Sequence, residues 1–459
     1  MPPASPPKTY RVKSFGCQMN VYDGERMAEL LDAQGISPAA DGEQADLVVL
    51  NTCHIREKAS EKVYSDIGRI GKDWSRKDGS APLIAVAGCV AQAEGEEIMA
   101  RAPAVSMVVG PQAYHRLPGM IADAVDGRRS VDTDMPAQTK FAALPARRKV
   151  APGAFLTVQE GCDKFCTYCV VPYTRGAEIS RPFSDLTDEA RRLVDAGARE
   201  ITLLGQNVNA WRDADGRGLE MLIEVLAAMP ELARIRYTTS HPNDMTDGLI
   251  AAHRDIDKLM PFLHLPVQAG NDRVLKAMNR SHTADSYLRV LDKVRAARPD
   301  IALSGDFIVG FPGETDAEFE DTIKLVDRVG YAQCFSFKYS PRPGTPAAAM
   351  DNQIAAAVMD KRLQRLQAAI NAGQLAFNTA SVGKRCEVLV ERRGKLEGQW
   401  LGKSPWLQSV HFAGDAAIGD LVEVELIEAG GNSLSGRLIG KTPRPDHPGQ
   451  GALAVQQNQ

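Results

Sequence analysis

Short apolar runs alternate with amphipathic stretches over the first 127 residues of the chain. The runs occupy residues 10–17, 45–53 and 81–89, and residues 24–35 between the first two have apolar positions at helical spacing. Gly35 is a typical stop signal for that helix. Compact apolar runs are typical of parallel strands buried on both faces of a sheet. Residues 8–127 are therefore predicted to form a small doubly wound α/β domain.

The same alternation resumes at residue 151 and continues to about residue 350. Apolar runs that predict strands lie at 154–161, 199–207, 233–240, 262–268, 301–311 and 333–340. Helical patterns separate these runs, with two helices after 268 and another from about Asp316. About six β/α units of this kind predict parallel strands with right-handed crossovers. The natural closure is a partial (β/α)6 barrel, with its chemistry on the loops that follow the strands.

The pattern changes again toward the C-terminus. Residues 354–378 have helical periodicity, and residues 379–441 hold five short alternating segments with Gly-rich turns. Such segments predict a small all-β barrel. The expected organisation is an α/β domain at 8–127, a linker at 128–150, a partial barrel at 151–378, a β-barrel at 379–441 and a disordered tail at 442–459.

Composition narrows the class of protein. The 459 residues carry a net charge of -4, so any binding to nucleic acid must rest on a local basic patch. The N-terminus lacks the apolar core of a secretory signal, and no long apolar run predicts a membrane span. A cytoplasmic location is therefore expected, and thiols stay reduced there. The eight cysteines are accordingly interpreted as ligands, reactive groups or buried residues, not as a disulfide framework.

Three cysteines share one structural position. Cys17, Cys53 and Cys89 each lie just past the carboxyl end of a predicted strand. In open α/β sheets this edge is where ligands bind. The alternative is three unrelated buried thiols, because free cysteine is commonly buried. The repeated position favours a shared ligand.

A second triad follows the first strand of the predicted partial barrel, as Cys162, Cys166 and Cys169 in CDKFCTYC. Soft thiolates select zinc, copper(I) or iron–sulfur clusters. A structural zinc takes four ligands, and the fold would have to supply the fourth from His241, His253 or His264. A 4Fe-4S cluster with three protein ligands keeps one open iron, which suits the amino and carboxylate groups of S-adenosylmethionine. An electron passed to the sulfonium would then release a 5′-deoxyadenosyl radical. The number of cysteines and the surrounding barrel favour the cluster.

Eight segments resemble the methylthiotransferase family of radical S-adenosylmethionine enzymes, most closely its bacterial MiaB-type members. They are FGCQMN at 15–20, NTCHIREKA at 51–59, AGCVAQAEGE at 87–96, GCDKFCTYCVVPYTRGAEISRP at 161–182, LLGQNVNAW at 203–211, HLPVQAGNDRVLKAMNR at 264–280, DFIVGFPGET at 306–315 and YSPRPGTP at 339–346. The resemblance spans nearly the whole chain except its two tails. Ala269 in QAGND departs mildly from the family pattern, which has Ser there.

The resemblance implies a role for each triad. The cysteines at 162, 166 and 169 would bind the radical-generating cluster, and Tyr168 would present its backbone to the adenine of S-adenosylmethionine. The cysteines at 17, 53 and 89 would bind an auxiliary 4Fe-4S cluster with an open iron, where a sulfur is methylated and then delivered.

The implied reaction is methylthiolation of carbon 2 of N6-dimethylallyladenosine next to the anticodon in tRNA. It would use two clusters and two S-adenosylmethionine molecules per turnover. The implied partners are the tRNA anticodon stem-loop and an electron donor such as flavodoxin or ferredoxin, and the protein is expected to be a monomer.

Two alternatives stay open from the sequence. One is a sister methylthiotransferase that acts on threonylcarbamoyladenosine in tRNA or on a ribosomal-protein aspartate. FGCQMN, CTYCVVPYTRG and LLGQNVN favour the prenyladenosine enzyme. The other is a non-catalytic RNA-binding protein with structural zinc, which analysis for iron and sulfide would separate.

Further residues are candidate ligand contacts. Gln206, Asn207 and Asn209 follow a predicted strand on the functional face of the barrel, although an Asn-rich turn is the simpler interpretation. Gly310 and Gly313 in GFPGET would allow a ligand to approach the backbone, or would only form a turn.

Other charged and thiol side chains have a simpler alternative. Arg175 and Arg181 flank the second triad and suit a carboxylate or phosphate, or are surface arginines. Cys334 and Cys386 lie inside predicted strands and are interpreted as structural.

The C-terminal segment carries a candidate RNA surface. Arg392, Arg393 and Lys403 lie near Trp400 and Trp406, and basic groups beside aromatic rings suit single-stranded or loop RNA. Tryptophan in a small barrel is more often part of the core. The segment also resembles a TRAM domain, which implies RNA binding.

Overall fold

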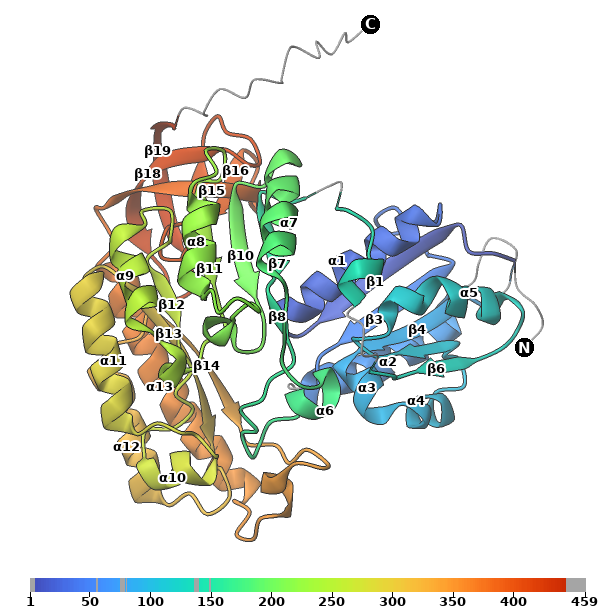
Figure 1. Ribbon diagram of the computed structural model, residues 1–459, viewed down its shortest axis with the longest axis horizontal. Helices are drawn as coiled ribbons and strands as arrows, with labels where there is room; N and C mark the ends of the chain where they lie inside the picture. The colour runs from blue at the N-terminus through green and yellow to red at the C-terminus, as the bar shows by residue number, and fades with distance from the viewer. Residues whose placement is uncertain are drawn as a thin grey trace, which may run out of the picture.

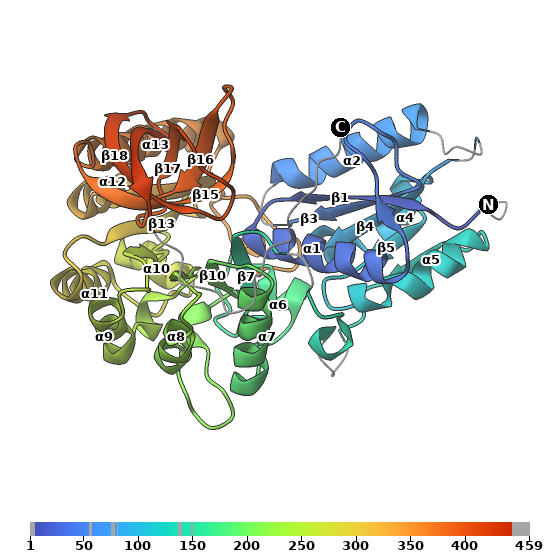
Figure 2. The ribbon, with the colours of Figure 1, turned by 90° about the horizontal axis from the view of Figure 1, so that it is seen from above.

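The computed structural model describes residues 5–54, 57–74, 79, 81–135, 140–147 and 150–442. Three units follow one another along the chain, and the N-terminal unit lies beside the other two (Figure 1). Seen from above, the C-terminal barrel lies against the partial barrel (Figure 2). The tail expected over 442–459 falls, apart from residue 442, outside the described residues.

The N-terminal unit contains a six-stranded parallel sheet with the order β2-β1-β3-β4-β5-β6. Its strands are β1 (Thr9–Phe15), β2 (Ser37–Pro38), β3 (Leu47–Thr52), β4 (Leu83–Gly88), β5 (Met107–Val109) and β6 (Ser130–Asp132). The three predicted strands are β1, β3 and β4. The linker expected from residue 128 is corrected, because β6 pairs with β5 as the edge of the sheet. A strand of three residues is too short to give a periodic signal.

Helices cover both faces of this sheet. They are α1 (Gln18–Ala33) and α5 (Leu117–Val125) on one face, and α2 (Glu57–Asp73), α3 (Cys89–Glu94) and α4 (Glu96–Arg101) on the other. In β3, Leu47 and Val49 pack under α1 and α5, while Val48 and Leu50 pack under α2, α3 and α4. Successive side chains of the strand thus pack into separate hydrophobic cores on the two faces of the sheet. This confirms the doubly wound prediction.

The middle unit is an open barrel of six parallel strands. They are β7 (Gly153–Thr157), β10 (Glu200–Leu204), β11 (Arg234–Tyr237), β12 (Phe262–His264), β13 (Ala302–Val309) and β14 (Gln333–Lys338). They form two three-stranded sheets joined by a bridge from Ile235 to Leu259, with β7 and β14 at the outer edges. The short strands β8 (Gln159–Glu160) and β9 (Ile179–Ser180) flank the second cysteine triad. The partial (β/α)6 prediction is confirmed.

Helices pack on the outside of these strands and bury one large core. They are α7 (Phe183–Asp195), α8 (Leu219–Ala227), α9 (Asp247–Asp255), α11 (Ala284–Ala297), α12 (Asp316–Val329) and α13 (Ala356–Thr379). Shorter helical segments are α6 (Val171–Arg175), α10 (Asp272–Ala277), η1 (Tyr114–Arg116), η2 (Lys140–Ala143), η3 (Val208–Ala210), η4 (Pro242–Asp244) and η5 (Pro346–Ala349). None of the described helices is long and apolar enough to cross a membrane.

The C-terminal unit is a closed barrel with the order β15-β16-β17-β19-β18. Its strands are β15 (Arg385–Arg393), β16 (Gln399–Lys403), β17 (Ser409–Ala413), β18 (Leu421–Ala429) and β19 (Leu434–Lys441). Inward-facing Val388, Val410 and Phe412 belong to its core. The prediction of a small all-β barrel is confirmed.

Two buried arginines at the start of β11 attach this barrel to the middle unit. Arg234 donates to the carbonyl oxygens of Lys403 and Glu387 at 2.8 and 2.7 Å. Arg236 donates to the carbonyl of Ser404 at 2.9 Å and pairs with Glu200 at 2.9 Å. Charged donors to carbonyl oxygens are among the stronger hydrogen bonds, so the barrel is held firmly at one end of the β strands.

Candidate six-cysteine site between the units

One cavity of about 560 Å³ is lined by all six cysteines of the two triads. The N-terminal triad (Cys17, Cys53 and Cys89) comes from the doubly wound unit, and the barrel triad (Cys162, Cys166 and Cys169) comes from the middle unit. The helix α6, which follows the barrel triad, lies where the two units meet (Figure 1). Two triads that lie far apart in the sequence therefore open into the same space.

The fold of the sheet explains the N-terminal triad. Cys17 and Cys53 follow β1 and β3, and Cys89 is the first residue of α3 after β4. These three strands are neighbours and run parallel, so their carboxyl ends meet at one edge of the sheet. A backbone hydrogen bond of 3.2 Å from Cys53 to Phe15 holds two of the loops together. The structure places these thiols where the strand-end pattern predicted them.

Three of the cysteines directly follow a glycine that allows the cysteine loops to pack closely. Gly16 precedes Cys17, Gly88 precedes Cys89 and Gly161 precedes Cys162, all with positive φ. A Cβ on Gly16 would lie 2.2 Å from the Cβ of Cys53, and one on Gly161 would lie 1.9 Å from the carbonyl oxygen of Ala177. Any side chain there would push the cysteine loops apart. Sequence reasoning missed these glycines, although FGC, AGC and EGC carried the signal.

We expect Gly16→Ala to remove most of the iron that the N-terminal triad can bind, because the new Cβ collides with Cys53. The matched control is Gly197→Ala. Gly197 has nearly the same φ, 106° against 111° for Gly16, but it has nothing within 4 Å of its added Cβ. Both variants carry a similar backbone cost, so the difference between them reports the crowding. Iron and sulfide after anaerobic reconstitution are the measurement, and equal iron in both variants would contradict the expectation.

The thiols differ in their tendency to ionise. A hydrogen bond from Cys53 and the nearby Arg175 guanidinium lower the pKa of Cys17 to about 6, in spite of burial. Burial raises the pKa of Cys162 to about 11 and that of Cys169 to about 12. Thiolates are the form that binds a metal. Filling the barrel triad therefore releases protons, and cluster assembly there is favoured as the pH rises.

Two of the predicted amide residues line the cavity, and each has one buried polar atom without a partner among the described residues. Gln206 and Asn207 line it together with Tyr168. Gln206 Oε1 accepts from the backbone N–H of Gly161 at 2.6 Å, while its Nε2 has no hydrogen-bond partner among the described residues. Asn207 donates to Asp244 at 2.8 Å, and its Oδ1 is likewise without a partner in that part of the chain. A buried donor and a buried acceptor without partners are expected where a polar ligand binds.

Three other predicted contact residues are not part of the cavity lining and contact the chain itself, so their role as ligand contacts stays a prediction. Asn209 uses both ends of its amide on the backbone of His241, at 2.8 Å each. The backbone N–H of Gly310 donates to Glu314 at 2.7 Å, and that of Gly313 donates to Asn352 O at 2.9 Å. The φ values of the two glycines, 73° and 75°, show that the turn itself requires them.

The flanking arginines both meet carboxylates of the chain itself. Arg175 is buried, lines the cavity and pairs with Asp23 at 2.6 Å. Arg181 is also buried, and it pairs with Glu189 at 2.7 Å outside the cavity. The carboxylate interpretation therefore holds for both, and the surface interpretation is wrong.

The histidines considered as zinc ligands divide into two groups. His241 and His264 line the cavity, whereas His253 is buried elsewhere with its Nε2 2.7 Å from the Tyr237 hydroxyl. Burial lowers the pKa of His241 to about 2, so this ring is neutral. Among the described residues, there is no group of three or more His, Cys, Asp or Glu side chains placed so that they could hold a metal ion.

Among the other lining residues, Arg280, Ser304 and Phe335 were not singled out from the sequence. Arg280 Nη1 lies 3.7 Å from Cys166 Sγ, and its Nη2 donates to Pro266 O at 2.6 Å. Its position at the end of the 264–280 segment was the available signal. Inside the barrel, His264 Nδ1 is 3.0 Å from Ser304 Oγ, and the Phe335 ring stands edge-on to the imidazole at 6.2 Å.

In the C-terminal barrel, both tryptophans take part in packing, and Trp400 is buried. Trp400 is buried in the core and donates to Gly414 O at 3.0 Å, with Arg393 stacked 4.6 Å from its ring. Trp406 donates to Asp300 O of the middle unit at 2.9 Å. The stacking interpretation is thus wrong for the buried Trp400, whereas for the partly exposed Trp406 it stays a prediction; Arg392 and Arg393 are exposed.

Lys403 and the two remaining cysteines make contacts within the protein. Lys403 donates to Ser409 at 2.9 Å. Cys386 is part of the barrel core, and Cys334 packs against the core of the middle unit.

Family models match three stretches of the chain. Residues 9–110 match the Uncharacterized protein family UPF0004, residues 156–326 match the Radical SAM superfamily, and residues 380–439 match the TRAM domain.

Full-length relatives carry one shared name, tRNA-2-methylthio-N(6)-dimethylallyladenosine synthase. The relative from Novosphingobium aromaticivorans is 79% identical and covers 95% of this chain and 99% of its own length. The one from Erythrobacter litoralis is 76% identical, with 96% and 99% covered. The one from Zymomonas mobilis subsp. mobilis is 63% identical, with 94% and 97% covered.

Solved structures share the fold at low identity. The radical S-adenosylmethionine methyltransferase TsrM from Kitasatospora setae, with cobalamin and a [4Fe-4S] cluster bound, superimposes with a TM-score of 0.55 at 12% identity and covers 74% of this chain and 77% of its own. The cobalamin-dependent radical enzyme OxsB gives 0.50 at 12% identity, with 80% and 56% covered.

Proposed function

The chain belongs to the family of tRNA-2-methylthio-N(6)-dimethylallyladenosine synthases, and from this premise we propose how its two triads divide the reaction. It is a radical S-adenosylmethionine tRNA methylthiotransferase. The barrel triad holds the 4Fe-4S cluster that generates the radical, and the N-terminal triad holds a second, auxiliary 4Fe-4S cluster. The observation that carries this proposal is the single cavity lined by all six thiols.

The two groups would supply distinct chemistry when bound: one would pass an electron to S-adenosylmethionine, which would split into methionine and a 5′-deoxyadenosyl radical, and the other would provide the sulfur of the methylthio group. The protein must then keep the radical and the sulfur on either side of one substrate atom. Two S-adenosylmethionine molecules are used per turnover, one as methyl donor and one as radical source. A radical is needed because no side-chain base removes a hydrogen from an unactivated aromatic carbon.

Residues around the barrel triad fit S-adenosylmethionine. Gln206 and Asn207 line the cavity, and their buried Nε2 and Oδ1, which have no partner among the described residues, would be available as a donor and an acceptor to a ligand. The Tyr168 backbone would contact the adenine, and Arg280 adds a positive charge near Cys166. This set suits a ligand that carries both a carboxylate and an ammonium group.

The inside of the partial barrel fits the target base. His264, Ser304 and Asp306 form a polar patch there, with His264 Nε2 3.6 Å from Asp306 Oδ2. Phe335 and Phe337 line the same cavity and suit the apolar prenyl group. A base in an anticodon loop is unpaired and can be splayed out of its stack into such a pocket.

The proposal extends to the partners of the enzyme and to its location. The tRNA anticodon stem-loop binds across the cavity mouth and the TRAM domain, where Arg392 and Arg393 are exposed. Binding then rests on a local basic patch, because the chain as a whole is acidic. An electron donor such as flavodoxin or ferredoxin supplies the reducing electron, and the protein acts as a monomer in the cytoplasm.

One anaerobic assay tests the proposal. Reconstituted protein, reductant and S-adenosylmethionine are mixed with prenylated tRNA that lacks the methylthio group, and threonylcarbamoyl tRNA is run in parallel. Nucleosides and 5′-deoxyadenosine are read by mass spectrometry. We expect a methylthio product on the prenylated tRNA alone.

Each other result points to a different error. Product on threonylcarbamoyl tRNA would assign the chain to the sister enzymes. Formation of 5′-deoxyadenosine without any product would keep the radical chemistry but reject the substrate. A colourless, iron-free protein after reconstitution would reject the cluster assignment for both triads.

A further inference from the structure

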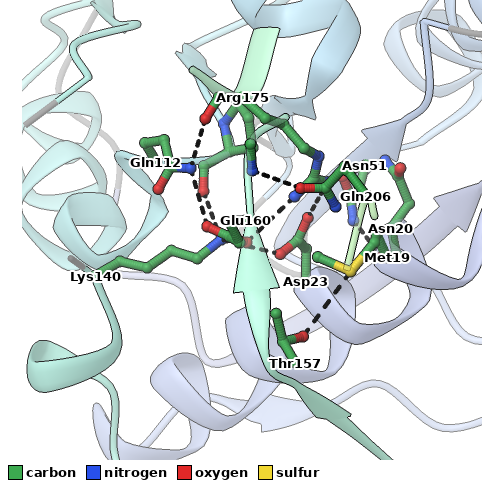
Figure 3. A network of polar contacts seen from close by, with 12 residues as sticks. Met19, Asn20, Asp23, Asn51, Gln112, Lys140, Thr157, Glu160, Arg175 and Gln206 are labelled. Atoms are coloured by element: carbon green, nitrogen blue, oxygen red, sulfur yellow. Dashed lines mark hydrogen bonds and ion pairs between the residues drawn. The ribbon is translucent and has the colours of Figure 1, made fainter. Parts of the chain in front are cut away.

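The junction between the N-terminal and middle units contains a closed set of buried charges (Figure 3). Lys140 and Asp23 are 0% and 1% exposed as side chains, and Glu160 and Arg175 are 2% and 3% exposed. Lys140 Nζ lies 3.2 Å from Asp23 and 2.7 Å from Glu160. Arg175 lies 2.6 Å from Asp23 and 3.3 Å from Glu160. Each cation thus contacts both anions, and the charges balance.

The four residues come from four separate segments of the chain. Asp23 lies on α1, Lys140 on η2, Glu160 on β8 and Arg175 on α6. Gln112, which follows β5, donates to both Glu160 and the Arg175 carbonyl at 2.9 and 3.1 Å. Removing any one charge leaves an uncompensated charge away from water, which is costly. The set therefore fixes the N-terminal unit against the loop that carries the barrel triad.

Arg175 also faces the N-terminal triad. It ends α6, whose first residue, Val171, comes two residues after Cys169, and α6 packs against α3, which begins at Cys89. Burial raises the pKa of the Cys89 thiol and the positive charge of Arg175 opposes this, while the same charge helps to lower the pKa of the Cys17 thiol. It lines the six-cysteine cavity as well. One side chain therefore connects both triads and the charge set.

We propose that Arg175 is a positioning residue that Asp23 and Glu160 hold against the N-terminal triad, where it sets both the charge around the bound auxiliary cluster and its separation from the barrel triad. Lys140 completes the arrangement by balancing the second negative charge. This inference rests on the proposed function, because it takes the N-terminal triad to hold a cluster.

Two consequences follow from electrostatics and geometry. A cluster bound by three thiolates carries negative charge, and a fixed cation beside it favours its reduced state. Loss of Arg175 should therefore make the reduction potential of the auxiliary cluster more negative. It should also let the sulfur drift from the target carbon, so that radical formation continues while product formation falls.

The test uses the full-length chain with Cys162, Cys166 and Cys169 all changed to Ala, so that only the N-terminal triad can bind a cluster. The midpoint potential and the electron paramagnetic resonance spectrum of that cluster are measured in this parent and in Arg175→Met, Arg175→Lys and Arg181→Met. Arg181 is the matched control, because it is also a buried arginine paired with a carboxylate but lies outside the cavity. Arg175→Lys keeps the charge and loses the two-pronged geometry.

We expect Arg175→Met to lower the potential and alter the spectrum, Arg175→Lys to retain most of the potential, and Arg181→Met to match the parent. In chains with both triads intact, Arg175→Met should lower the ratio of methylthio product to 5′-deoxyadenosine by about tenfold or more, the usual range for residues that orient metal ligands.

Four results would overturn the inference. An unchanged potential and ratio in Arg175→Met would do so while leaving the two-cluster proposal intact. The same changes in Arg181→Met would mean a general effect of losing a buried arginine. If Arg175→Met fails to fold, Arg175→Lys decides. An unchanged reduction potential together with an unchanged ratio of methylthio product to 5′-deoxyadenosine in that variant would reject the positioning role. A parent that binds no iron at all would reject both this inference and the auxiliary cluster.

Discussion

Cys17→Ala is expected to abolish methylthio product on prenylated tRNA while formation of 5′-deoxyadenosine continues. Cys17 lies at the sheet edge, with Cys53 and Cys89 as its companions, and takes no part in the barrel triad. A hydrogen bond from Cys53 and the charge of Arg175 lower the pKa of the Cys17 thiol to about 6, so the thiolate that ligates iron forms readily. Loss of one of three ligands should release the auxiliary cluster and leave the barrel triad able to cleave S-adenosylmethionine.

Two further variants make this expectation decisive. Cys162→Ala should remove both product and 5′-deoxyadenosine, because it deprives the radical cluster of a ligand. Cys386→Ala is the matched control: Cys386 is a buried thiol in the C-terminal barrel core, and its loss should spare both products. Mass spectrometry of nucleosides and 5′-deoxyadenosine reads all three variants. Product from Cys17→Ala at the rate of the parent chain would show that this triad holds no sulfur donor.

The periodic pattern predicted the elements that carry the site because each strand is a compact apolar run between turn signals. β1, β3 and β4 were visible in this way, and so was the common position of the cysteines that follow them. Strand order could not be read, but parallel neighbours bring their carboxyl ends together in any such sheet. The edge strand β6, with three residues, gave no period to detect.

Residue type was a weaker guide than position. Gly310 and Gly313 were candidates for ligand approach because glycine allows it, but a positive φ in a turn makes the same demand on the sequence. Asn209 differs from Asn207 only in which way its amide points, and the backbone of His241 decides that. The two tryptophans beside basic residues suggested a stacking surface, whereas the fold places Trp400 in the barrel core.

The buried charges at the unit junction were the feature that the sequence could predict least. Lys140 and Asp23 are 117 residues apart along the chain, and each is an ordinary charged residue in its local sequence. Burial of such a pair depends on how two separately folded units meet. Local patterns predict each unit but carry little information about their contact.

Lys140→Met should lower the free energy of unfolding by about 3–5 kcal/mol, the usual effect of breaking a buried ion pair from one side. Methionine has a similar length, so packing changes little, but Asp23 and Glu160 would then share the single charge of Arg175. Unfolding by urea of the cluster-free protein, followed by circular dichroism and fluorescence, is the measurement. A loss below about 1 kcal/mol would mean that water or a rearrangement satisfies the carboxylates.

The pH dependence adds a signature that packing cannot imitate. Burial alone would raise the pKa of Asp23, but Arg175 and Lys140 outweigh it and lower the pKa below its ordinary value of 3.8. Stability from this carboxylate is therefore complete above that value and is lost as the pH falls through the folded pKa. Without Lys140 the folded pKa rises, so acid unfolding should begin at a higher pH in Lys140→Met. Lys293→Met, which breaks an exposed ion pair with Asp247, should leave the acid transition in place. If both variants shift it equally, the stabilisation at the junction does not come from the buried charge set.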